Sequence, residues 1–327
     1  MLGVRLTGTG RADVAPALDN HQLSRLVDTS DEWIVTRTGI RTRRLAAPHQ
    51  GVTDLAVQAA QNALVSAGLS PLEVELVILA TSTPDDLFGS ASLVLEQLGA
   101  KRAVAFDLTA ACSGFVFGLV TAAQFLKTGT YRRAVVIGAD VLSRWVDWRD
   151  RRTCVLFGDG AGAVVLETSP QEGLLGFELQ NDGSQNACLT LAYQGQPQPL
   201  IDDLTVTLGA YQPIAMNGQE VYKFAVKRVP EVIEKALFRA GLTSDQIDYF
   251  VLHQANQRIL EAVATRLGVP PERMLSNVAR YGNTSAASIP LVLDEAVRAG
   301  QIQAGHTLVL AGFGAGLTLG AVVCRWG

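Results

Sequence analysis

The chain has 327 residues, of which 48% are apolar and 18% are charged, and its formal net charge is −4. This length exceeds what one hydrophobic core usually supports, so two subdomains are expected, and the apolar content excludes a disordered chain. The weakly acidic balance gives no reason to expect nucleic acid, and an anionic partner would need a local basic patch.

The cysteines and histidines are scattered along the sequence. The cysteines form no Cys-x-x-Cys pair and no signal peptide opens the chain, which favours a reducing, cytoplasmic location. The histidines lack metal-ligand spacing, so we expect no structural or catalytic metal. The longest uncharged run, residues 308–324, is interrupted by glycines and is shorter than a usual membrane span. We therefore predict two strands and a turn there, and no membrane association.

The first predicted strand, residues 4–8, is followed by a polar segment over residues 28–40. This segment contains Trp33 and Arg37, which we expect at the surface. Exposed charge is usually only solvated. An aromatic ring among arginines would also suit a phosphate-bearing ligand with a ring that stacks. The segment alone leaves both interpretations open.

Helices and strands then alternate, as in a layered α/β protein. The apolar pattern predicts helices over residues 53–67 and 90–98 and strands over residues 74–80 and 134–138. The loop over residues 81–89 contains Phe88.

Cys112 follows a predicted buried strand over residues 104–108 and opens a segment with helical periodicity that Gly129 ends. Free backbone N–H groups and the helix dipole favour an anion at such a position. We therefore expect a lowered thiol pKa and a nucleophilic sulfur at Cys112. The alternative is a small buried core residue, and position alone does not separate the two.

The second half of the chain copies the first. Ala63-Leu64 matches Ala236-Leu237, and the apolar triplet 77–79 matches 250–252, each 173 positions later. A predicted helix over residues 285–298 matches the Cys112 helix, and the glycine motif 158–162 matches 312–316. We predict two similar halves about a pseudo-twofold axis, over residues 1–170 and 211–327, with an insertion over residues 171–210.

The pseudo-twofold axis should bring three reactive side chains from distant parts of the chain to one cleft. His253 follows a predicted strand, and Asn283 lies in the copy of the Cys112 turn. Singly, each is equally well a core, cap or turn residue. Together they supply a nucleophile and two groups that can hydrogen-bond a carbonyl oxygen.

Two other chemistries fit poorly. The glycine motifs are followed by strand-like sequence, whereas a dinucleotide fingerprint needs a helix there. A glycine turn can instead let the backbone approach an active site and donate an N–H to an oxyanion. Ser113 lacks a Gly-x-Ser-x-Gly elbow, which disfavours serine hydrolysis.

These motifs resemble those of the β-ketoacyl-acyl-carrier-protein synthases of type III, and the resemblance covers essentially the whole chain. It is based on residues 29–40, 110–115, 253–256, 282–288 and 312–316. It implies a thiolase-like α/β fold of two pseudo-twofold halves, layered α-β-α-β-α. It also implies a homodimer without a cofactor that starts type II fatty acid synthesis.

In the implied reaction, Cys112 takes an acyl group from acyl-CoA, acetyl-CoA being expected. His253 and Asn283 hold malonyl-acyl carrier protein while it loses CO₂ and condenses to 3-oxoacyl-acyl carrier protein. The backbone N–H groups of Cys112 and Ala315 form the oxyanion hole, although relatives often have glycine at the position of Ala315.

The resemblance also implies binding residues. Coenzyme A would contact Thr29, Trp33, Arg37, Arg151, Gly218 and Asn256. Acyl carrier protein would dock on Gln254, Ala255, Asn256, Gln257 and Arg258, with Lys223, Lys227 and Arg266 as weaker candidates. Phe88 would reach across the dimer and limit the acyl pocket. No role follows for Arg152.

Two alternatives remain. One is a starter-unit or ester-forming acyltransferase of the same fold in a specialised pathway, which would release no CO₂ from malonyl-acyl carrier protein. The other is a non-catalytic scaffold that binds acyl carrier protein and would form no acyl adduct on Cys112. The intact set of Cys112, His253 and Asn283 favours condensation.

Overall fold

The computed structural model describes residues 2–327 and contains two five-stranded sheets. The first has the order β1 (Gly3–Arg11), β7 (Gly160–Ser169), β6 (Arg133–Asp140), β4 (Leu76–Ala80) and β5 (Val104–Leu108). The second has the order β14 (Met274–Leu275), β13 (Tyr249–Leu252), β15 (Thr307–Gly314), β16 (Thr318–Arg325) and β8 (Leu174–Asn181).

The two sheets have the same topology. Strand β4 lies between two parallel neighbours, β5 and β6, and β13 lies between β14 and β15 in the same way. Two antiparallel strands complete each sheet, β7 and β1 in the first and β16 and β8 in the second. The apolar triplets that match in sequence fall on β4 and β13, which confirms the predicted duplication.

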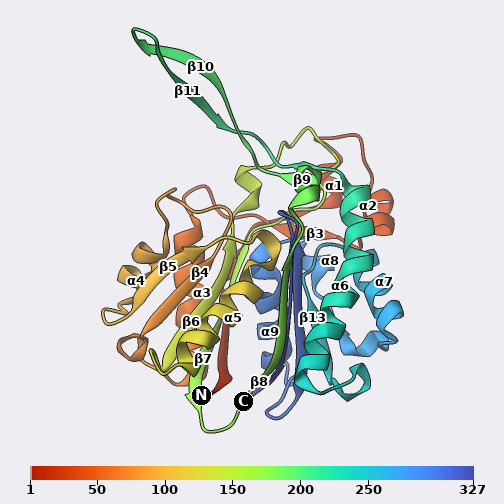
Figure 1. Ribbon diagram of the computed structural model, residues 1–327. Coiled ribbons are helices and arrows are strands. Elements are labelled where there is room, and N and C mark those ends of the chain that lie inside the picture. The colour runs from red at the N-terminus through yellow and green to blue at the C-terminus, as the bar shows by residue number, and fades with distance from the viewer. Residues whose placement is uncertain (1) are drawn as a thin grey trace.

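Helices separate and cover the sheets (Figure 1). Helices α5 (Gly114–Lys127) and α9 (Ser288–Arg298) lie between them. The outer face of the first sheet is covered by α3 (Val52–Ala67) and α4 (Ala91–Leu98), and that of the second by α6 (Gly218–Ala240) and α7 (Gln257–Leu267). The result is the predicted α-β-α-β-α layering of the thiolase fold.

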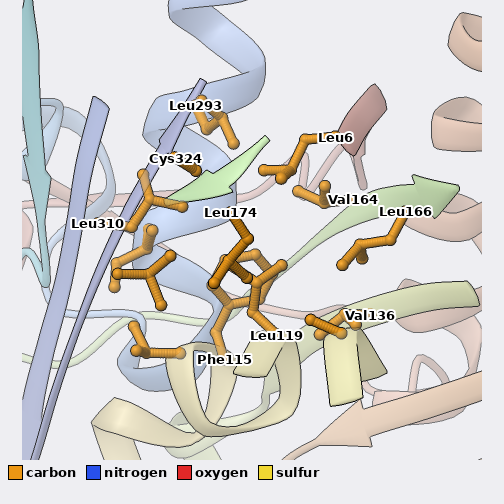
Figure 2. Close-up of a cluster of buried hydrophobic side chains, with 14 of the residues drawn as sticks. Leu6, Phe115, Leu119, Val136, Val164, Leu166, Leu174, Leu293, Leu310 and Cys324 are labelled. Carbon is orange, nitrogen blue, oxygen red and sulfur yellow. The ribbon is translucent and has the colours of Figure 1, made fainter. Parts of the chain in front are cut away.

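The central core lies between the sheets (Figure 2). Phe115 and Leu119 of α5 and Leu293 of α9 meet Val136 of the first sheet and Leu310 of the second. All five are fully buried. Because this cluster joins both halves, it fixes the first turns of α5 and α9 relative to each other.

Smaller elements surround one end of the sheets. They include helices α1 (Asn20–Leu23), α2 (Asp31–Thr38) and α8 (Val278–Tyr281), and the strand pairs β2 (Ala17–Asp19) with β3 (Thr42–Arg44) and β9 (Leu189–Thr190) with β12 (Ala215–Met216). Short 3₁₀ turns are η1 (Pro71–Glu73), η2 (Ala111–Ser113), η3 (Leu142–Arg144), η4 (Gly183–Cys188), η5 (Ser244–Gln246), η6 (Pro271–Arg273) and η7 (Ser285–Ala287).

The segment over residues 171–210 differs from the single insertion expected. Its first part is β8, an edge strand of the second sheet. Only its later part leaves the body of the molecule, as the hairpin of β10 (Tyr193–Ile201) and β11 (Leu204–Tyr211), which projects outward in Figure 1. The Gly, Gln and Pro residues that follow favoured an insertion over the whole segment, although β8 itself contains Leu174, Leu175, Phe177 and Leu179.

Strand β5, expected to be buried, is instead the last strand of its sheet. Val104 is 50% exposed, because no strand of this chain pairs with the outer edge of β5 in the part that the structure describes. The loop that precedes α4 lies beside β5, since Asp107 accepts hydrogen bonds from the backbone N–H groups of Ser90 and Ala91.

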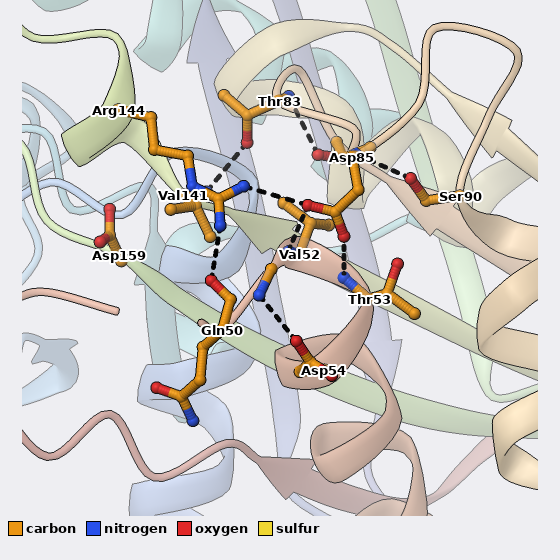
Figure 3. A network of polar contacts seen from close by, with 12 residues as sticks. Gln50, Val52, Thr53, Asp54, Thr83, Asp85, Ser90, Val141, Arg144 and Asp159 are labelled. Carbon is orange, nitrogen blue, oxygen red and sulfur yellow. Dashed lines mark hydrogen bonds and ion pairs between the residues drawn. The ribbon is translucent and has the colours of Figure 1, made fainter. Parts of the chain in front are cut away.

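A polar network fixes this loop (Figure 3). Asp85 accepts hydrogen bonds from the N–H groups of Val52 and Thr53 at the start of α3, at 3.1 and 2.8 Å. Arg144 pairs with the same carboxylate at 3.1 Å. The neighbouring Phe88 is fully exposed. The loop is therefore held in place while its aromatic side chain stays free.

In residues 2–327, no helix has both the length and the apolar character needed to cross a membrane.

Candidate active site

Cys112 lies on η2, between β5 and α5. The residue before it, Ala111, has a left-handed backbone with φ +47°, which turns the chain sharply into the helix. The turn is pressed against β15: a Cβ on Gly314 would lie 2.6 Å from the Cys112 backbone nitrogen. Glycine at 314 therefore allows the close approach of β15 to the nucleophile turn.

The expected lowering of the Cys112 pKa is wrong. Burial raises the pKa of the thiol to about 12, which a hydrogen bond from Ser285 partly opposes and the nearby Asp140 charge reinforces. Burial raises the pKa of the thiol more than the dipole of the nearby helix start lowers it, because the whole thiolate charge loses its contact with water. At neutral pH the resting sulfur is therefore a protonated thiol.

His253 directly follows β13 and is 1% exposed. Its Nδ1 lies 2.7 Å from the hydroxyl of Ser288 on α9, and that hydroxyl accepts the backbone N–H of Gln254. We assign the Ser288 proton to the bond with Nδ1, which leaves a proton on Nε2. Burial lowers the pKa of His253 to about 3, so the ring is a neutral hydrogen-bond donor.

Asn283 is held by backbone bonds to the loop before β7. Its N–H donates to Leu156 and its carbonyl accepts from Gly158, at 2.8 and 2.9 Å. The side-chain Oδ1 accepts the N–H of Ser285 at 2.9 Å. Because Oδ1 is occupied in this way, Nδ2 is left to donate into the cavity.

Cys112, His253 and Asn283 line one cavity, as the pseudo-twofold axis implies. Its volume is about 610 Å³ including its mouth. Most of the remaining wall is apolar and comes from both halves: Leu156, Phe157, Leu189, Met216, Gly218, Val221, Tyr222, Phe224, Ala255, Asn256, Ile259, Phe313, Gly314 and Leu317. A thiol and two neutral donors thus share an apolar pocket, where hydrogen bonds to a developing negative charge are strongest.

Ala315, the residue expected to complete the oxyanion hole, does not line the Cys112 cavity. Gly314 lines the Cys112 cavity, whereas Ala315 lines a neighbouring open cleft together with Ala110, Ala111 and Phe88. The oxyanion role of the Ala315 N–H therefore stays a prediction. Phe88 lines the cleft and not the cavity of its own chain, so any effect of Phe88 on an acyl pocket would have to come from another subunit.

The residues expected to hold the adenine end of coenzyme A form one surface group. The guanidinium carbons of Arg37 and Arg151 lie 5.0 and 5.5 Å from the centre of the Trp33 ring. Arg151 also donates to the Asp28 carbonyl at 2.8 Å. The buried hydroxyl oxygen of Thr29 has no hydrogen-bond partner within residues 2–327, as expected if a ligand supplies one.

This surface group is connected to the cavity. Trp33 packs against the same apolar cluster as Phe157, Leu189 and Met216, which line the cavity. Gly218 and Asn256, the two expected pantetheine contacts, lie on the cavity wall itself. The six residues thus extend from the surface toward Cys112.

The expected docking segment is only partly at the surface. The side chain of Gln254 is fully buried and bonds the carbonyl of Leu252 at 2.7 Å, so it supports the fold and cannot dock a partner. Ala255 and Asn256 line the cavity, and Asn256 caps α7. Gln257 is half-buried, and Arg258 is exposed beside Tyr222 of the cavity mouth, at 5.6 Å from its ring.

Three further cations extend this surface along α6 and α7. Lys223 pairs with Glu220, and Arg266 pairs with Glu231, while Lys227 is exposed between them. Arg152 forms an ion pair with Asp150 at 2.9 Å and is exposed.

Sequence analysis missed several residues that shape the site. Ser288 and Ser285 lie in the motif over residues 282–288, but no pattern separates them from helix-capping serines. Phe313 lies edge-on to the His253 ring at 5.1 Å. Only the three-dimensional contact identifies such a residue.

Known proteins resemble this chain along most of its length. The family model 3-oxoacyl-[acyl-carrier-protein (ACP)] synthase III matches residues 106–183, and the model of its C-terminal part matches residues 237–326. The beta-ketoacyl-[acyl-carrier-protein] synthase III of Trichormus variabilis is 60% identical over 326 residues, which cover 100% of this chain and 99% of the relative. That of Synechococcus elongatus is 62% identical and covers 100% and 98%.

Solved structures agree as well. The 3-oxoacyl-[acyl-carrier-protein] synthase III of Aquifex aeolicus has a TM-score of 0.91 at 43% identity, with 99% of this chain and 100% of that chain covered. The priming beta-ketosynthase of the R1128 polyketide pathway has a TM-score of 0.90 at 33% identity, with 99% and 96% covered. The chain is therefore a thiolase-fold condensing enzyme. More specifically, the chain belongs to the β-ketoacyl-acyl-carrier-protein synthase III family.

Proposed function

We propose that this chain is the initiating condensing enzyme of type II fatty acid synthesis. It transfers an acyl group, which we expect to be acetyl, from acyl-CoA to Cys112 and condenses it with malonyl-acyl carrier protein. The products are 3-oxoacyl-acyl carrier protein, CoA and CO₂. The observation that carries the proposal is that Cys112, His253 and Asn283 line one apolar cavity. The relatives that are about 60% identical are named beta-ketoacyl-[acyl-carrier-protein] synthase III, which also supports it.

In the first half-reaction, the sulfur of Cys112 attacks the thioester carbonyl of acyl-CoA. As the new C–S bond forms, the bond between the carbonyl carbon and the CoA sulfur breaks, and the S–H proton ends on the departing CoA sulfur. Backbone N–H groups at η2 and at the turn after β15 would hold the oxyanion. The apolar wall excludes water, which protects the acyl-enzyme from hydrolysis.

In the second half-reaction, malonyl-acyl carrier protein enters the same cavity. Nε2 of His253 and Nδ2 of Asn283 donate to its thioester carbonyl. The bond to CO₂ breaks, and these donors stabilise the enolate that forms. The carbanion attacks the acyl group on Cys112, the C–S bond breaks, and the thiolate recovers a proton.

The partners follow from the same assignment. The proposed enzyme works in the cytoplasm as a homodimer and uses no cofactor, acyl-CoA and malonyl-acyl carrier protein being substrates. The open outer edge of β5 and the exposed Phe88 beside it support a second copy at this edge.

The proposal is tested by incubating the enzyme with acetyl-CoA and malonyl-acyl carrier protein. We expect equal amounts of CO₂ and of acetoacetyl-acyl carrier protein, the first measured by trapping and the second by intact mass. An acetyl adduct without CO₂ release would instead indicate a pure acyltransferase. Neither product would indicate a scaffold.

Alanine variants of two adjacent arginines test the coenzyme A contacts. Arg151→Ala removes the guanidinium over Trp33, so the KM for acetyl-CoA should rise about tenfold with little change in kcat, because the contact is remote from the reacting sulfur. Arg152→Ala is the matched control, since Arg152 pairs only with Asp150. Steady-state kinetics with varied acetyl-CoA measures both, and equal effects of the two variants would contradict the assignment.

The docking surface is tested by charge reversal. Arg258→Glu should raise the KM for malonyl-acyl carrier protein at least about tenfold, because a rim cation steers an acidic partner, while self-acylation by acetyl-CoA stays within about twofold. Lys235→Glu is the control, because Lys235 is an exposed cation farther along α6 and away from the cavity. A normal KM in Arg258→Glu would remove Arg258 from the docking surface.

A further inference from the structure

Arg43 of β3 is a fully buried arginine that lies outside the cavity and takes no part in the reaction described above. Its guanidinium donates to the Leu18 carbonyl at 3.2 Å, to the Asn20 side-chain oxygen at 2.7 Å and to the Val155 carbonyl at 3.2 Å. All three acceptors are neutral, and the buried Nε–H has no hydrogen-bond partner within residues 2–327. Burying a charge in this way is costly, so a residue that only filled this space would more simply be apolar.

The Val155 carbonyl belongs to the loop that holds Asn283. Farther along this loop, the Leu156 carbonyl accepts the Asn283 N–H at 2.8 Å, and the Gly158 N–H donates to the Asn283 carbonyl at 2.9 Å. These two bonds form an isolated parallel bridge between the loop and the catalytic segment. The loop therefore sets the backbone position of Asn283, and Arg43 bonds the loop one residue before the first of these contacts.

The aliphatic stem of Arg43 packs on both backbones of this bridge. A Cβ on Gly158 would lie 3.2 Å from the Arg43 Cβ, and a Cβ on Gly282 would lie 3.3 Å from it. The added atom on Gly158 would also lie 2.4 Å from the Tyr281 carbonyl oxygen. Glycine at these positions therefore leaves room for the stem and for the close approach of the two backbones. Gly282 directly precedes Asn283, so the stem contacts the chain beside the carboxamide.

The other two hydrogen bonds fix Arg43 to a separate part of the molecule. Leu18 belongs to β2, and Asn20 begins α1. Asn20 is buried, and its amide nitrogen donates to the Asp31 carboxylate and to the Ile40 carbonyl, both at 2.8 Å. Because both N–H groups of this amide are occupied, its oxygen faces Arg43 in one orientation. The guanidinium thus joins the loop before β7 to a fixed support.

We propose that Arg43 is a positioning residue for Asn283, which it holds at the distance from Cys112 that decarboxylative condensation requires. The inference rests on the proposed function, in which Nδ2 of Asn283 stabilises the enolate. Without the guanidinium, the Val155 carbonyl loses its tie to β2 and α1, and the loop and Asn283 shift together. A misplacement of about 1 Å at a reacting group can cost about 10²-fold in rate.

The test measures both half-reactions in Arg43→Met, which keeps an unbranched stem and loses all three hydrogen bonds. CO₂ release from malonyl-acyl carrier protein by the acetyl-enzyme should fall at least about tenfold. Acetylation by acetyl-CoA should stay within about threefold of wild type, because no hydrogen bond of Arg43 reaches η2 or β15 beside Cys112. Arg44→Met is the matched control, since Arg44 lies on the same strand but lines a surface pocket away from the cavity. Both of its rates should match the wild type.

A double variant separates positioning from a general loosening of the fold. In the Asn283→Ala background, adding Arg43→Met should change CO₂ release by less than about twofold, because the side chain that Arg43 positions is already absent. A merely structural role would lower CO₂ release by the same factor in both backgrounds, or would lower acetylation equally. Either result, or unchanged CO₂ release in the single variant, would overturn the inference.

Arg43→Lys keeps the test valid if Arg43→Met does not fold. A lysine retains the charge, but its single ammonium group does not reproduce the planar fork that reaches three acceptors. CO₂ release should therefore fall at least about threefold in Arg43→Lys, with acetylation again within about threefold. Equal losses of both half-reactions in this variant would also overturn the inference.

A crystal structure of the same variant distinguishes failure of the inference from failure of the proposed function. Relative to the wild type, Nδ2 of Asn283 should move by at least about 1 Å from its place beside Cys112, while His253 stays in position. This measurement needs no activity, so it decides the inference even if the wild type releases no CO₂. An unmoved Asn283 would contradict the positioning role.

Discussion

Replacing Cys112 by alanine is expected to abolish acyl transfer from acetyl-CoA, by at least about three orders of magnitude. The nearest hydroxyl does not replace the thiol. The hydroxyl of the neighbouring Ser113 is buried and bonded to Thr318 at 2.5 Å and to the Ala110 carbonyl at 2.7 Å. The sulfur is therefore the group able to form the acyl-enzyme.

Intact mass after incubation with acetyl-CoA measures this effect directly. The wild type should gain one acetyl group, and Cys112→Ala should gain none. Cys188→Ala provides the control, because Cys188 is only partly buried and lies outside the cavity, and it should be acetylated like the wild type. An acetyl group that remains in Cys112→Ala would assign the nucleophile elsewhere.

Replacing His253 or Asn283 by alanine should abolish condensation while leaving acylation intact. Each variant removes one donor to the enolate, and loss of such a donor typically costs about 10²–10³ in rate. Acylation should stay within about threefold of wild type, because the oxyanion of the first half-reaction is held by backbone N–H groups. The division follows from the geometry, in which both side-chain donors face the cavity and neither bonds the sulfur.

Two assays separate these half-reactions. Intact mass follows acetylation by acetyl-CoA, and CO₂ release follows the reaction of the acetyl-enzyme with malonyl-acyl carrier protein. His306→Ala is the control, because His306 stacks on Tyr249 at 5.6 Å, away from the cavity. Equal loss of both half-reactions in His253→Ala would contradict the assignment.

The pH dependence of condensation follows from the neutral imidazole. Burial lowers the pKa of His253 to about 3, so protonation becomes significant only as the pH falls toward that value. Between about pH 5 and about pH 8 the ring keeps its Nε2 donor, and no loss of condensation should arise from His253. A decline of the wild-type condensation rate centred at about pH 6.5, with acylation unchanged, would instead show that the ring titrates normally.

The duplication made much of the fold predictable from sequence. The matching triplets at β4 and β13 predicted two similar halves, and the matching turns predicted that Cys112 and Asn283 would lie on opposed helix starts. Features that depend on environment were not predictable. The pKa of Cys112 depends on burial and on Asp140, which is distant in sequence, and the burial of Gln254 depends on contacts from residues near β14.

The positions of the edge strands of both sheets were also not predictable from the sequence. Strand β5 has an apolar sequence that suits a central strand, yet it is the last strand of its sheet. Strand β8 opens a segment that is rich in Gly, Gln and Pro after it, yet it pairs with β16. An edge strand is defined by the absence of a neighbour, and periodicity within one segment does not report its neighbours.

A crystal structure of the enzyme soaked with acetyl-CoA tests the central claim most directly. We expect an acetyl group on the Cys112 sulfur and CoA extending from this cavity, past Asn256 and Gly218, to Trp33 at the surface. His253 and Asn283 should remain beside the acetyl group with their donors facing the vacant malonyl position. An unmodified Cys112 with CoA bound outside this cavity would contradict the account.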